Sequence, residues 1–358
     1  MPLEHYKILY TTLQRGDPRN AMKAPTHLGR GVIFAAGMAL SVICLVAVCR
    51  GAQLAEIKGV LRHASRLYIG LTLLFYATSI VGKAYRWRLL LPAARSTLSL
   101  GRLVSLILAG QTLNTWFVAH SGELTRAYLL GSRSEIGKAT ALSTIILENA
   151  LDSLFLLLAL ALLALILPLP AWLHTTSILL GVILVGVLLL LLVAAQRWER
   201  VQAWGAALAV RLPFASHVLL AALRAIGEGI WALRNRRERA RLLLATGVVW
   251  LVATLTTWAA MQAVSLSLPW YAPLFLLVVF QIGSVVPASP GKFGVFHYLA
   301  VQALALFRVP QEPALAFAIM LHTVAYVLMG LAGALCLWRE NQALHRQIAW
   351  RDSGEPMP

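Results

Sequence analysis

The chain of 358 residues is 59% hydrophobic and only 13% charged, whereas soluble domains are about 25% charged, so the composition excludes an ordinary soluble protein. The formal net charge of +17 would suggest a nucleic-acid partner in a soluble protein, but in membrane proteins Lys and Arg collect in cytoplasmic loops and set the orientation. We therefore predict an all-α polytopic integral membrane protein that has no nucleic-acid partner.

The first element is a basic tail, residues 1–30, and a transmembrane domain at residues 31–337 should follow it. Apolar runs of the kind that cross a bilayer recur through this domain. They lie at residues 31–48, 67–81, 139–167, 177–195, 242–266 and 314–337. These runs predict about six full transmembrane helices, and residues 338–358 would form a short C-terminal tail.

The distribution of charge assigns the two sides of the membrane. The loops at residues 168–176 and 265–274 contain no Lys, Arg, Asp or Glu, so both should be extracytoplasmic. The arginine-rich insertion at residues 198–241 should be cytoplasmic, as should both termini of this multi-pass protein of the cell membrane. Within the insertion, residues 217–234 have an apolar helical face and should lie in the interface. The "RNRRERAR" that ends it is either a topology anchor or a polybasic regulatory site.

Residues 102–119 are apolar enough to span the membrane, but they contain Gln111 and other polar side chains. Basic stretches lie on both sides, the first with Arg86 and the second with Arg126. A complete crossing would put these stretches in opposite compartments, whereas a re-entrant hairpin keeps both in the cytoplasm. Residues 102–119 are therefore predicted to form a re-entrant hairpin.

A second stretch of the chain is similar to this one. Residues 276–300 resemble residues 106–130, and Gln281 matches Gln111. Three predicted spans separate the two stretches, and an odd number inverts the second copy relative to the first. Inverted-repeat transporters have this pattern, and their binding sites lie where broken segments meet near the midplane. We expect two re-entrant hairpins in an inverted repeat, with both glutamines at the site.

The second hairpin should turn within "VVPASPGKFGVFHY", which begins at residue 285. Its helix breakers and turn formers are Pro287, Pro290, Gly291 and Gly294. A turn at membrane depth frees backbone N–H groups, and Lys292 beside them would make an anion site. The alternative is an ordinary extracellular loop in which Lys292 lies in water.

Two carboxylates, Glu148 and Asp152, lie four residues apart in a predicted span, so they share a helix face near mid-membrane. Each would cost roughly 2.5–3.5 kcal/mol there on insertion scales, and we therefore place both in a substrate pathway. The alternative is a structural ion pair, for instance with Arg126. Glu123 and Arg126 are candidates for the same pathway, or they pair with each other.

The last predicted span contains one polar interruption, His322, which joins the candidates for substrate translocation. Together with His120 and His297 it could suggest a metal site, but no close spacing supports one. The prediction is hydrogen-bonded membrane histidines, with no metal and no cofactor.

Three stretches resemble the membrane region of lysylphosphatidylglycerol synthases, over roughly residues 31–337. They read "HSGELTRAYLL", "ALSTIILENALD" and "PASPGKFGVFHYLAVQAL". The resemblance implies a region that moves aminoacylated phospholipid between leaflets, while a separate soluble domain makes the lipid. It places the family's signatures on Gly122, Glu123, Arg126, Glu148, Asp152, Pro287, Pro290, Gly291 and Gly294. His120 and Asn149 depart from these signatures, which leaves the choice of lipid open.

The predicted function is that of a flippase-like lipid translocase, not an enzyme, which moves a phospholipid, with aminoacylated lipid as one candidate. Its partners would be membrane lipids and a separate lipid-modifying synthase, because the short stretch after Leu337 leaves no room for an aminoacyl-transferring domain. The alternatives are an integral-membrane enzyme that acts on a lipid head group and an accessory partner of such a synthase. The sequence leaves the oligomeric state open.

Overall fold

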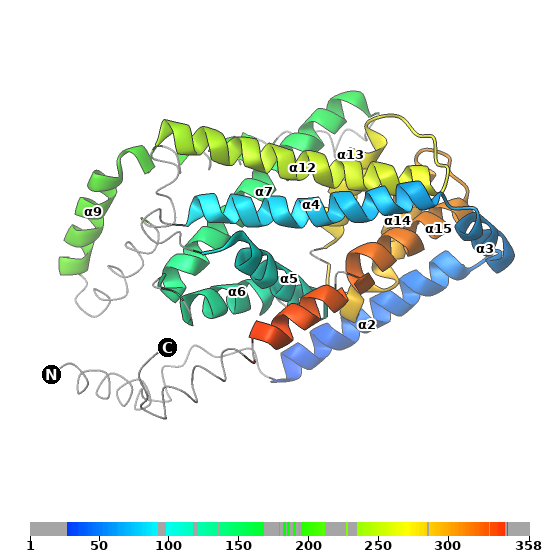
Figure 1. The fold of residues 1–358 in the computed structure, drawn as a ribbon, viewed down its shortest axis with the longest axis horizontal. Helices are drawn as coiled ribbons and strands as arrows, with labels where there is room; N and C mark the ends of the chain where they lie inside the picture. The colour runs from blue at the N-terminus through cyan, green and yellow to red at the C-terminus, as the bar shows by residue number, and fades with distance from the viewer. Residues whose placement is uncertain are drawn as a thin grey trace.

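A computed structural model describes most of the chain. It covers residues 27–91, 98–116, 121–132, 136–167, 195–211, 235–284, 286–328 and 330–340, with scattered positions at 134, 227, 342 and between 179 and 193. Within these ranges the secondary structure is helical throughout, without a strand (Figure 1). The elements are α2 (His27–Cys49), α3 (Leu54–Arg62), α4 (Arg66–Leu90), α5 (Leu100–Trp116), α6 (Ser121–Ser132), α7 (Lys138–Ile166), α9 (Trp198–Arg211), α12 (Arg236–Ala263), α13 (Ala272–Gly283), the 3-10 turn η3 (Pro290–Lys292), α14 (Val295–Ala305), α15 (Gln311–His322) and the π-helix η4 (Thr323–Leu328).

Four helical stretches are long and apolar enough to cross a membrane. They are α4, α7, α12 and the stretch Gln311–Glu340, which joins α15 and η4 to the helical residues 330–340. α2 and α3 meet at 85°, and the bent pair counts as a fifth span if it is one broken helix. The prediction of a polytopic α-helical membrane protein is confirmed. The number six stays a prediction, because the run at residues 177–195 falls largely outside the described residues.

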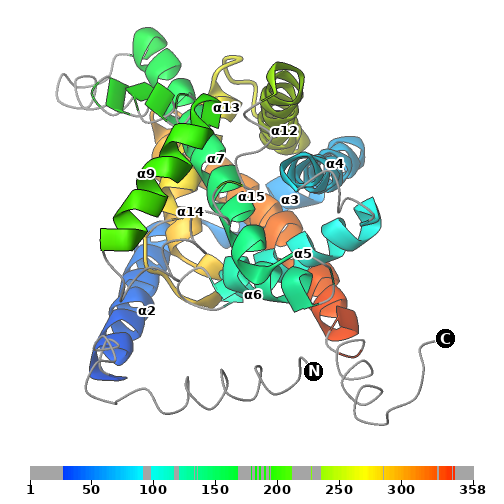
Figure 2. The same cartoon turned by 90° about the vertical axis from the view of Figure 1, so that its left-hand side faces the viewer.

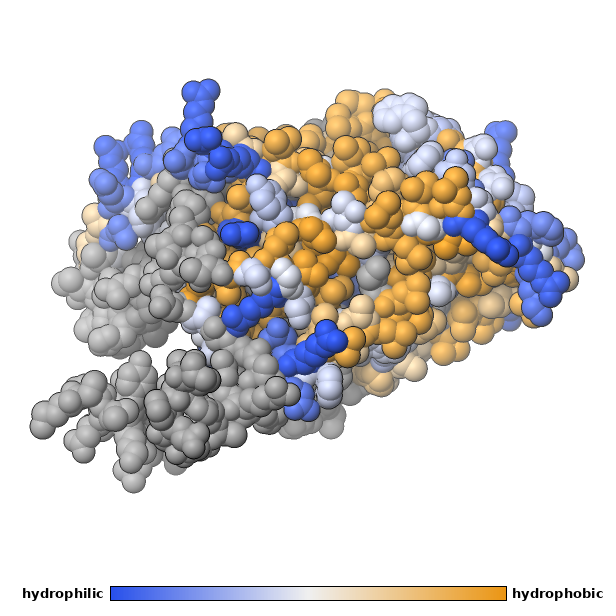
Figure 3. Space-filling model, in the orientation of Figure 1, coloured by the Kyte–Doolittle hydropathy of each residue, from blue (hydrophilic) through white to orange (hydrophobic). Residues whose placement is uncertain are grey.

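The outer surface supports this assignment. On the face seen in Figure 3, apolar side chains cover most of the middle of the molecule, and hydrophilic residues are densest towards its two ends, with a few between them. On α2, Phe34, Val42 and Ile43 are exposed, as are Leu158, Leu162 and Leu165 on α7. A continuous apolar surface of this kind is costly in water but suits the hydrocarbon core of a bilayer.

α4 and α12 lie side by side in opposite directions along the bundle (Figure 1). The amide of Ser65, just before α4, donates to the carbonyl oxygen of Ala263 at the end of α12, at 2.8 Å. The missing side chain of Gly82 allows close approach, since a Cβ there would lie 3.1 Å from Val249. Because α5 follows the end of α4 and α13 follows the end of α12, these two elements start from opposite ends of the bundle.

Each of these elements begins a pair of helices that pack on one another, α5 with α6 and α13 with α14. In the first pair, a Cβ at Gly122 would overlap the carbonyl oxygen of Gly110, so glycine is needed where the helices cross. The pairs correspond to the two predicted hairpins, and their opposite origins are what an inverted repeat requires. Their depth in a membrane and the repeat itself stay predictions.

Two clusters of buried apolar side chains hold the bundle together. One contains α5, α6, the last turns of α4 and the first half of α7. The other contains α13, α14, α15 and the last turns of α7 and α12. α15 runs through the middle of the bundle (Figure 2), where residues such as Ala316 and Phe317 are fully buried. The two hairpins therefore belong to different cores, and polar residues gather between them.

Several predicted segments lie mostly or wholly outside the described residues. They are the tails at residues 1–30 and 338–358, the loop at 168–176 and the interfacial helix at 217–234. The charge-free loop after α12 is described, and it connects Ala263 to Ala272. α12 itself begins with Asn235 as its N-cap, whose side chain accepts a hydrogen bond from the amide of Arg237 at 2.9 Å.

Candidate functional site

A polar cavity of about 410 Å³ lies between the two hairpins. Its walls come from α4, α5, α6, α7, α12 and α13, and from the segment that contains η3 and η4. The predicted site residues that line it are Gln111, Glu123, Arg126, Glu148, Asp152, Gln281 and Lys292. The fold therefore brings together residues that are up to about 180 positions apart in the sequence.

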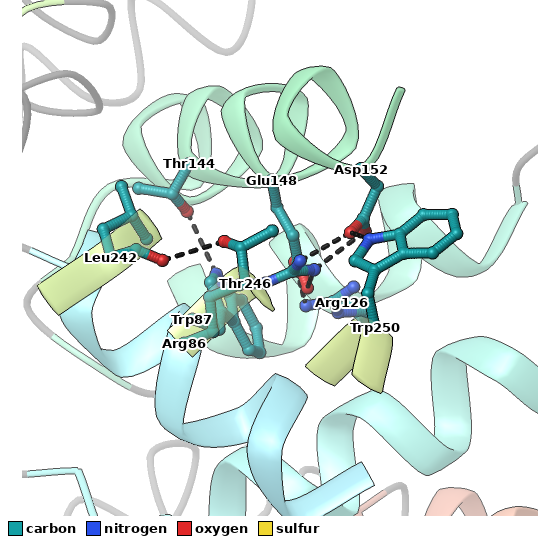
Figure 4. Close-up of polar contacts among 9 residues, drawn as sticks. All are labelled: Arg86, Trp87, Arg126, Thr144, Glu148, Asp152, Leu242, Thr246 and Trp250. Carbon is teal, nitrogen blue, oxygen red and sulfur yellow. Dashed lines mark hydrogen bonds and ion pairs between the residues drawn. The ribbon is translucent and has the colours of Figure 1, made fainter. Parts of the chain in front are cut away.

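The two carboxylates of α7 are held by arginines (Figure 4). Arg86 of α4 donates to Glu148 at 2.9 Å and to both oxygens of Asp152, one of them at 2.8 Å. Arg126 of α6 donates to the second oxygen of Glu148 at 2.9 Å. Arg86 is completely buried and Glu148 is 3% exposed, so both charges depend on this pairing.

Two tryptophans surround the ion pairs. The indole N–H of Trp250 donates to Asp152 at 3.0 Å, and that of Trp87 donates to Thr144 at 3.0 Å. The guanidinium of Arg126 lies 4.2 Å from the centre of the Trp87 ring, a cation–π contact. α4, α6, α7 and α12 are thus joined through one network of charges, hydrogen bonds and ring contacts.

The predicted ion pair of Glu148 with Arg126 is therefore present. Arg86, which was expected in a cytoplasmic basic stretch, is an equally close second partner of Glu148 and also the partner of Asp152. The predicted span ended too early, because α4 continues to Leu90 and Arg86 is buried within it. The apolar run at residues 67–81 is only 15 residues long, too short for a span of about 20. Extending it to that length would have brought Arg86 into the helix, together with Lys83, which also lines the cavity.

The first hairpin presents a polar surface to the cavity. Asn114 of α5 accepts a hydrogen bond from the amide of Gly122 at 2.8 Å and donates to Glu123 at 3.0 Å. Among the described residues Arg126 forms an ion pair with Glu148, and Glu123 accepts a hydrogen bond from Asn114. Residues 117–120, with His120, lie outside the described residues.

The second hairpin turns where the prolines and glycines predicted a turn. Gly291 and Gly294 have φ values of 74° and 82°, and Lys292 between them has a φ of 55°. Pro287 and Pro290 lie outside any α-helix, the former before η3 and the latter at its first position. The amide of Ser289 donates to the hydroxyl of Ser41 on α2 at 2.8 Å, which ties the turn to the neighbouring helix.

His322 is not among the residues that line the cavity. It is buried, and its Nε2 forms a 2.8 Å hydrogen bond with the carbonyl oxygen of Gly291. Its ring stacks on that of Tyr326, which does line the cavity, at 4.5 Å between centroids. His322 therefore fixes the turn of the second hairpin from behind the cavity wall. Within the described ranges, no group of His, Cys, Asp or Glu side chains is arranged to hold a metal ion.

The tips of the two hairpins meet. η3 packs against α5, and a Cβ on Gly291 would lie 3.7 Å from the ring of Trp116, the last residue of α5. Beside this contact η4 forms a short π-helix, a distortion that is frequent at functional sites. The result is a cavity with amide, hydroxyl and charged groups on its walls, inside a bundle whose outer surface is apolar.

Comparison with known sequences identifies the family of the chain. No curated protein sequence matches the chain. A sequence model of a protein family, described as the lysylphosphatidylglycerol synthase TM region, matches residues 34–333. That match covers three of the four long spans, the fourth as far as Gly333, and both hairpins. The chain therefore belongs to the family of lysylphosphatidylglycerol synthase transmembrane regions.

Proposed function

We propose that the protein is a lipid translocase that moves a phospholipid between the two leaflets of the cell membrane. The observation that carries this proposal is the polar cavity between two helical hairpins, inside a bundle with an apolar outer surface. A phospholipid presents the same division, because its head group needs polar contacts while its acyl chains remain in hydrocarbon. A cavity of about 410 Å³ has the volume of a small-molecule site and accommodates a head group.

The family supports a phospholipid as the substrate, because its name contains the phospholipid phosphatidylglycerol. Both termini and the arginine-rich insertion would lie in the cytoplasm, since positively charged segments are retained there.

The test is translocation in vesicles. Purified protein is reconstituted into liposomes with a trace of phospholipid labelled with a fluorophore on its acyl chain, and a membrane-impermeant reductant is added outside. Without translocation about half of the fluorescence survives, because the inner leaflet is protected. With an active translocase the signal should fall well below half.

A matched pair of substitutions locates the path. Ala253→Phe places a ring in the cavity, whereas Leu251→Phe adds a ring on the exposed face of the same helix. We expect the first to lower translocation at least tenfold and the second to leave it unchanged. Equal activity of both variants, or no activity of the unmodified protein over empty liposomes, would contradict the proposal.

The same vesicles test the enzyme alternative. If the protein modified a head group, mass spectrometry of the extracted lipid would reveal a product of changed mass. We expect the labelled lipid to be recovered unchanged.

A further inference from the structure

The charged side chains of the cavity fall into two classes. The first class, Glu123, Arg126, Glu148 and Asp152, has partners within the protein, and Glu123 accepts a hydrogen bond from Asn114. Both oxygens of Glu148 accept from arginines, and both oxygens of Asp152 accept from Arg86, with Trp250 as a further donor to Asp152. These carboxylates have already obtained the charge-assisted hydrogen bonds that an incoming lipid amine would offer.

Lys83 and Lys292 form the second class. Both line the cavity. Within the described ranges, no hydrogen bond or ion pair involves Lys83, although Asp152 and Glu148 are near enough to attract it. The ammonium of Lys292 donates to the carbonyl oxygen of Ser284 at 3.2 Å. Because an ammonium has three N–H donors, each lysine has donors available for a ligand.

The backbone at Lys292 adds an independent observation. Its φ of 55° lies in the left-handed region, which residues with a Cβ enter at a cost. Gly291 and Gly294 on either side supply the flexibility that the turn needs, so the lysine is not required for the turn itself. Strained residues of this kind cluster at ligand sites. The turn therefore holds the side chain of Lys292 at the hairpin tip, on the wall of the cavity.

The whole set of charges favours an anion. The cations are Lys83, Arg86, Arg126 and Lys292, and the carboxylates are Glu123, Glu148 and Asp152, so one positive charge is in excess. The amides of Gln111 and Gln281 also line the cavity and can donate to phosphate or glycerol oxygens. An added amine on the head group would be repelled by the two lysines. It would also find the carboxylate oxygens of α7 already bonded to arginines.

We propose that the cavity holds a phospholipid by its phosphate, between Lys83 and Lys292, and that it selects head groups of net negative charge over head groups that carry an amine. This inference rests on the proposed lipid translocation and names the class of lipid moved. In this arrangement Arg86 and its carboxylate partners hold the helices around the cavity together, and Lys83 and Lys292 bind the ligand.

Binding is measured first, independently of transport. Purified protein in uncharged detergent is titrated with short-chain phosphatidylglycerol, phosphatidylethanolamine or lysylphosphatidylglycerol, and its thermal unfolding is followed. Phosphatidylglycerol should bind about tenfold more tightly than the two amine-bearing lipids. Glycerol phosphate, which has the same phosphate chemistry without acyl chains, should stabilise the protein only at much higher concentration. Equal stabilisation by glycerol phosphate would assign the site to a soluble phosphate and overturn the proposal.

Substitution then tests the two lysines. Lys83→Gln and Lys292→Gln should each weaken phosphatidylglycerol binding about tenfold or more, the loss expected for a hydrogen bond to a charged group. Lys83→Arg and Lys292→Arg should retain binding, which shows that the charge matters and that the site tolerates substitution. Lys58→Gln, at an exposed position on α3, is the matched control and should bind as the unmodified protein does.

The same variants in vesicles separate this inference from the proposed function. Labelled phosphatidylglycerol should cross faster than labelled lysylphosphatidylglycerol, and the two glutamine variants should lose that preference. If lipid crosses at equal rates for both head groups, or if the glutamine variants keep the preference, the phosphate site is refuted while translocation stands. If no lipid crosses in the unmodified protein, the translocase itself is refuted.

Discussion

Arg86 is the residue on which the buried charges of the protein depend. It binds two carboxylates from α7, and neither it nor Glu148 has appreciable contact with solvent. Arg86 and Arg126 together balance Glu148 and Asp152, so the network is neutral as a unit. A neutral network of paired charges is tolerated at low dielectric, whereas any one of its charges alone is not.

Arg86→Met should therefore destabilise the protein severely. The substitution keeps much of the side-chain volume but leaves two carboxylates with one arginine between them, and loss of one partner from a buried pair costs about 3–5 kcal/mol. The measurement is the free energy or midpoint of unfolding in detergent. Arg88→Met is the control, since Arg88 is exposed two positions further along the same helix, and it should change stability little. Similar stability of both variants would mean that Arg86 is not a structural centre.

At the scale of elements, the second hairpin owes its shape to a turn that few residue types permit. Gly291, Lys292 and Gly294 all have positive φ. Around them, Ser41 and His322 bind the backbone from α2 and α15. The turn is therefore fixed on two sides, and its third side faces the cavity and Trp116.

Gly291→Ala should disturb this turn far more than an equivalent change elsewhere. Gly291 and Gly51 have nearly the same φ, 74° and 78°, but a Cβ at Gly291 would lie 2.8 Å from the ring of Phe293, whereas a Cβ at Gly51 meets nothing within 4 Å. Both alanines pay the backbone cost of about 1–2 kcal/mol. Only Gly291→Ala should also reduce translocation, several-fold at least, in the vesicle assay. Equal activity of the two variants would show that the tip is an ordinary loop.

At the scale of the whole molecule, the two hairpins belong to separate hydrophobic cores, and α7 and α12 contribute to both. α12 has 28 residues, with Asn235 before its first turn and the charge-free loop after its last. At 1.5 Å per residue this helix is about 42 Å long, enough to cross a bilayer.

Cysteine labelling should assign these ends to compartments. In a variant without Cys44, Cys49 and Cys336, a single cysteine at Ser267 should react with an impermeant reagent added to intact cells. A cysteine at Asn235 should react only after the membrane is permeabilised, because the arginines around it should retain that end in the cytoplasm. Labelling of Asn235 from outside would reverse the proposed orientation.

The sequence predicted the bounds of α7 well and the partners of its charged residues poorly. α7 begins at Lys138 and ends at Ile166, one residue from each predicted bound, because a long apolar run with a charged start has few alternatives. The turn at Gly291 was also predictable, since prolines and glycines act locally. The role of Arg86 was not found, because its partners lie on another helix and periodicity within α4 carries no information about them. The polar stripe of Tyr76, Ser79, Lys83 and Arg86, at helical spacing, was the available signal.

The separation of Arg86 from its partners has a consequence for biogenesis. Arg86 precedes Glu148 by 62 residues and Asp152 by 66, and Arg126 also precedes both carboxylates. During synthesis the two arginines thus emerge first, and α7 arrives later with acidic groups that cost roughly 2.5–3.5 kcal/mol each in lipid alone. The earlier helices offer α7 a charged partner as it leaves the translocation channel, so its insertion and its packing are a single event. A chain interrupted before Glu148 would leave both arginines without their carboxylates and should be removed by membrane quality control rather than accumulate.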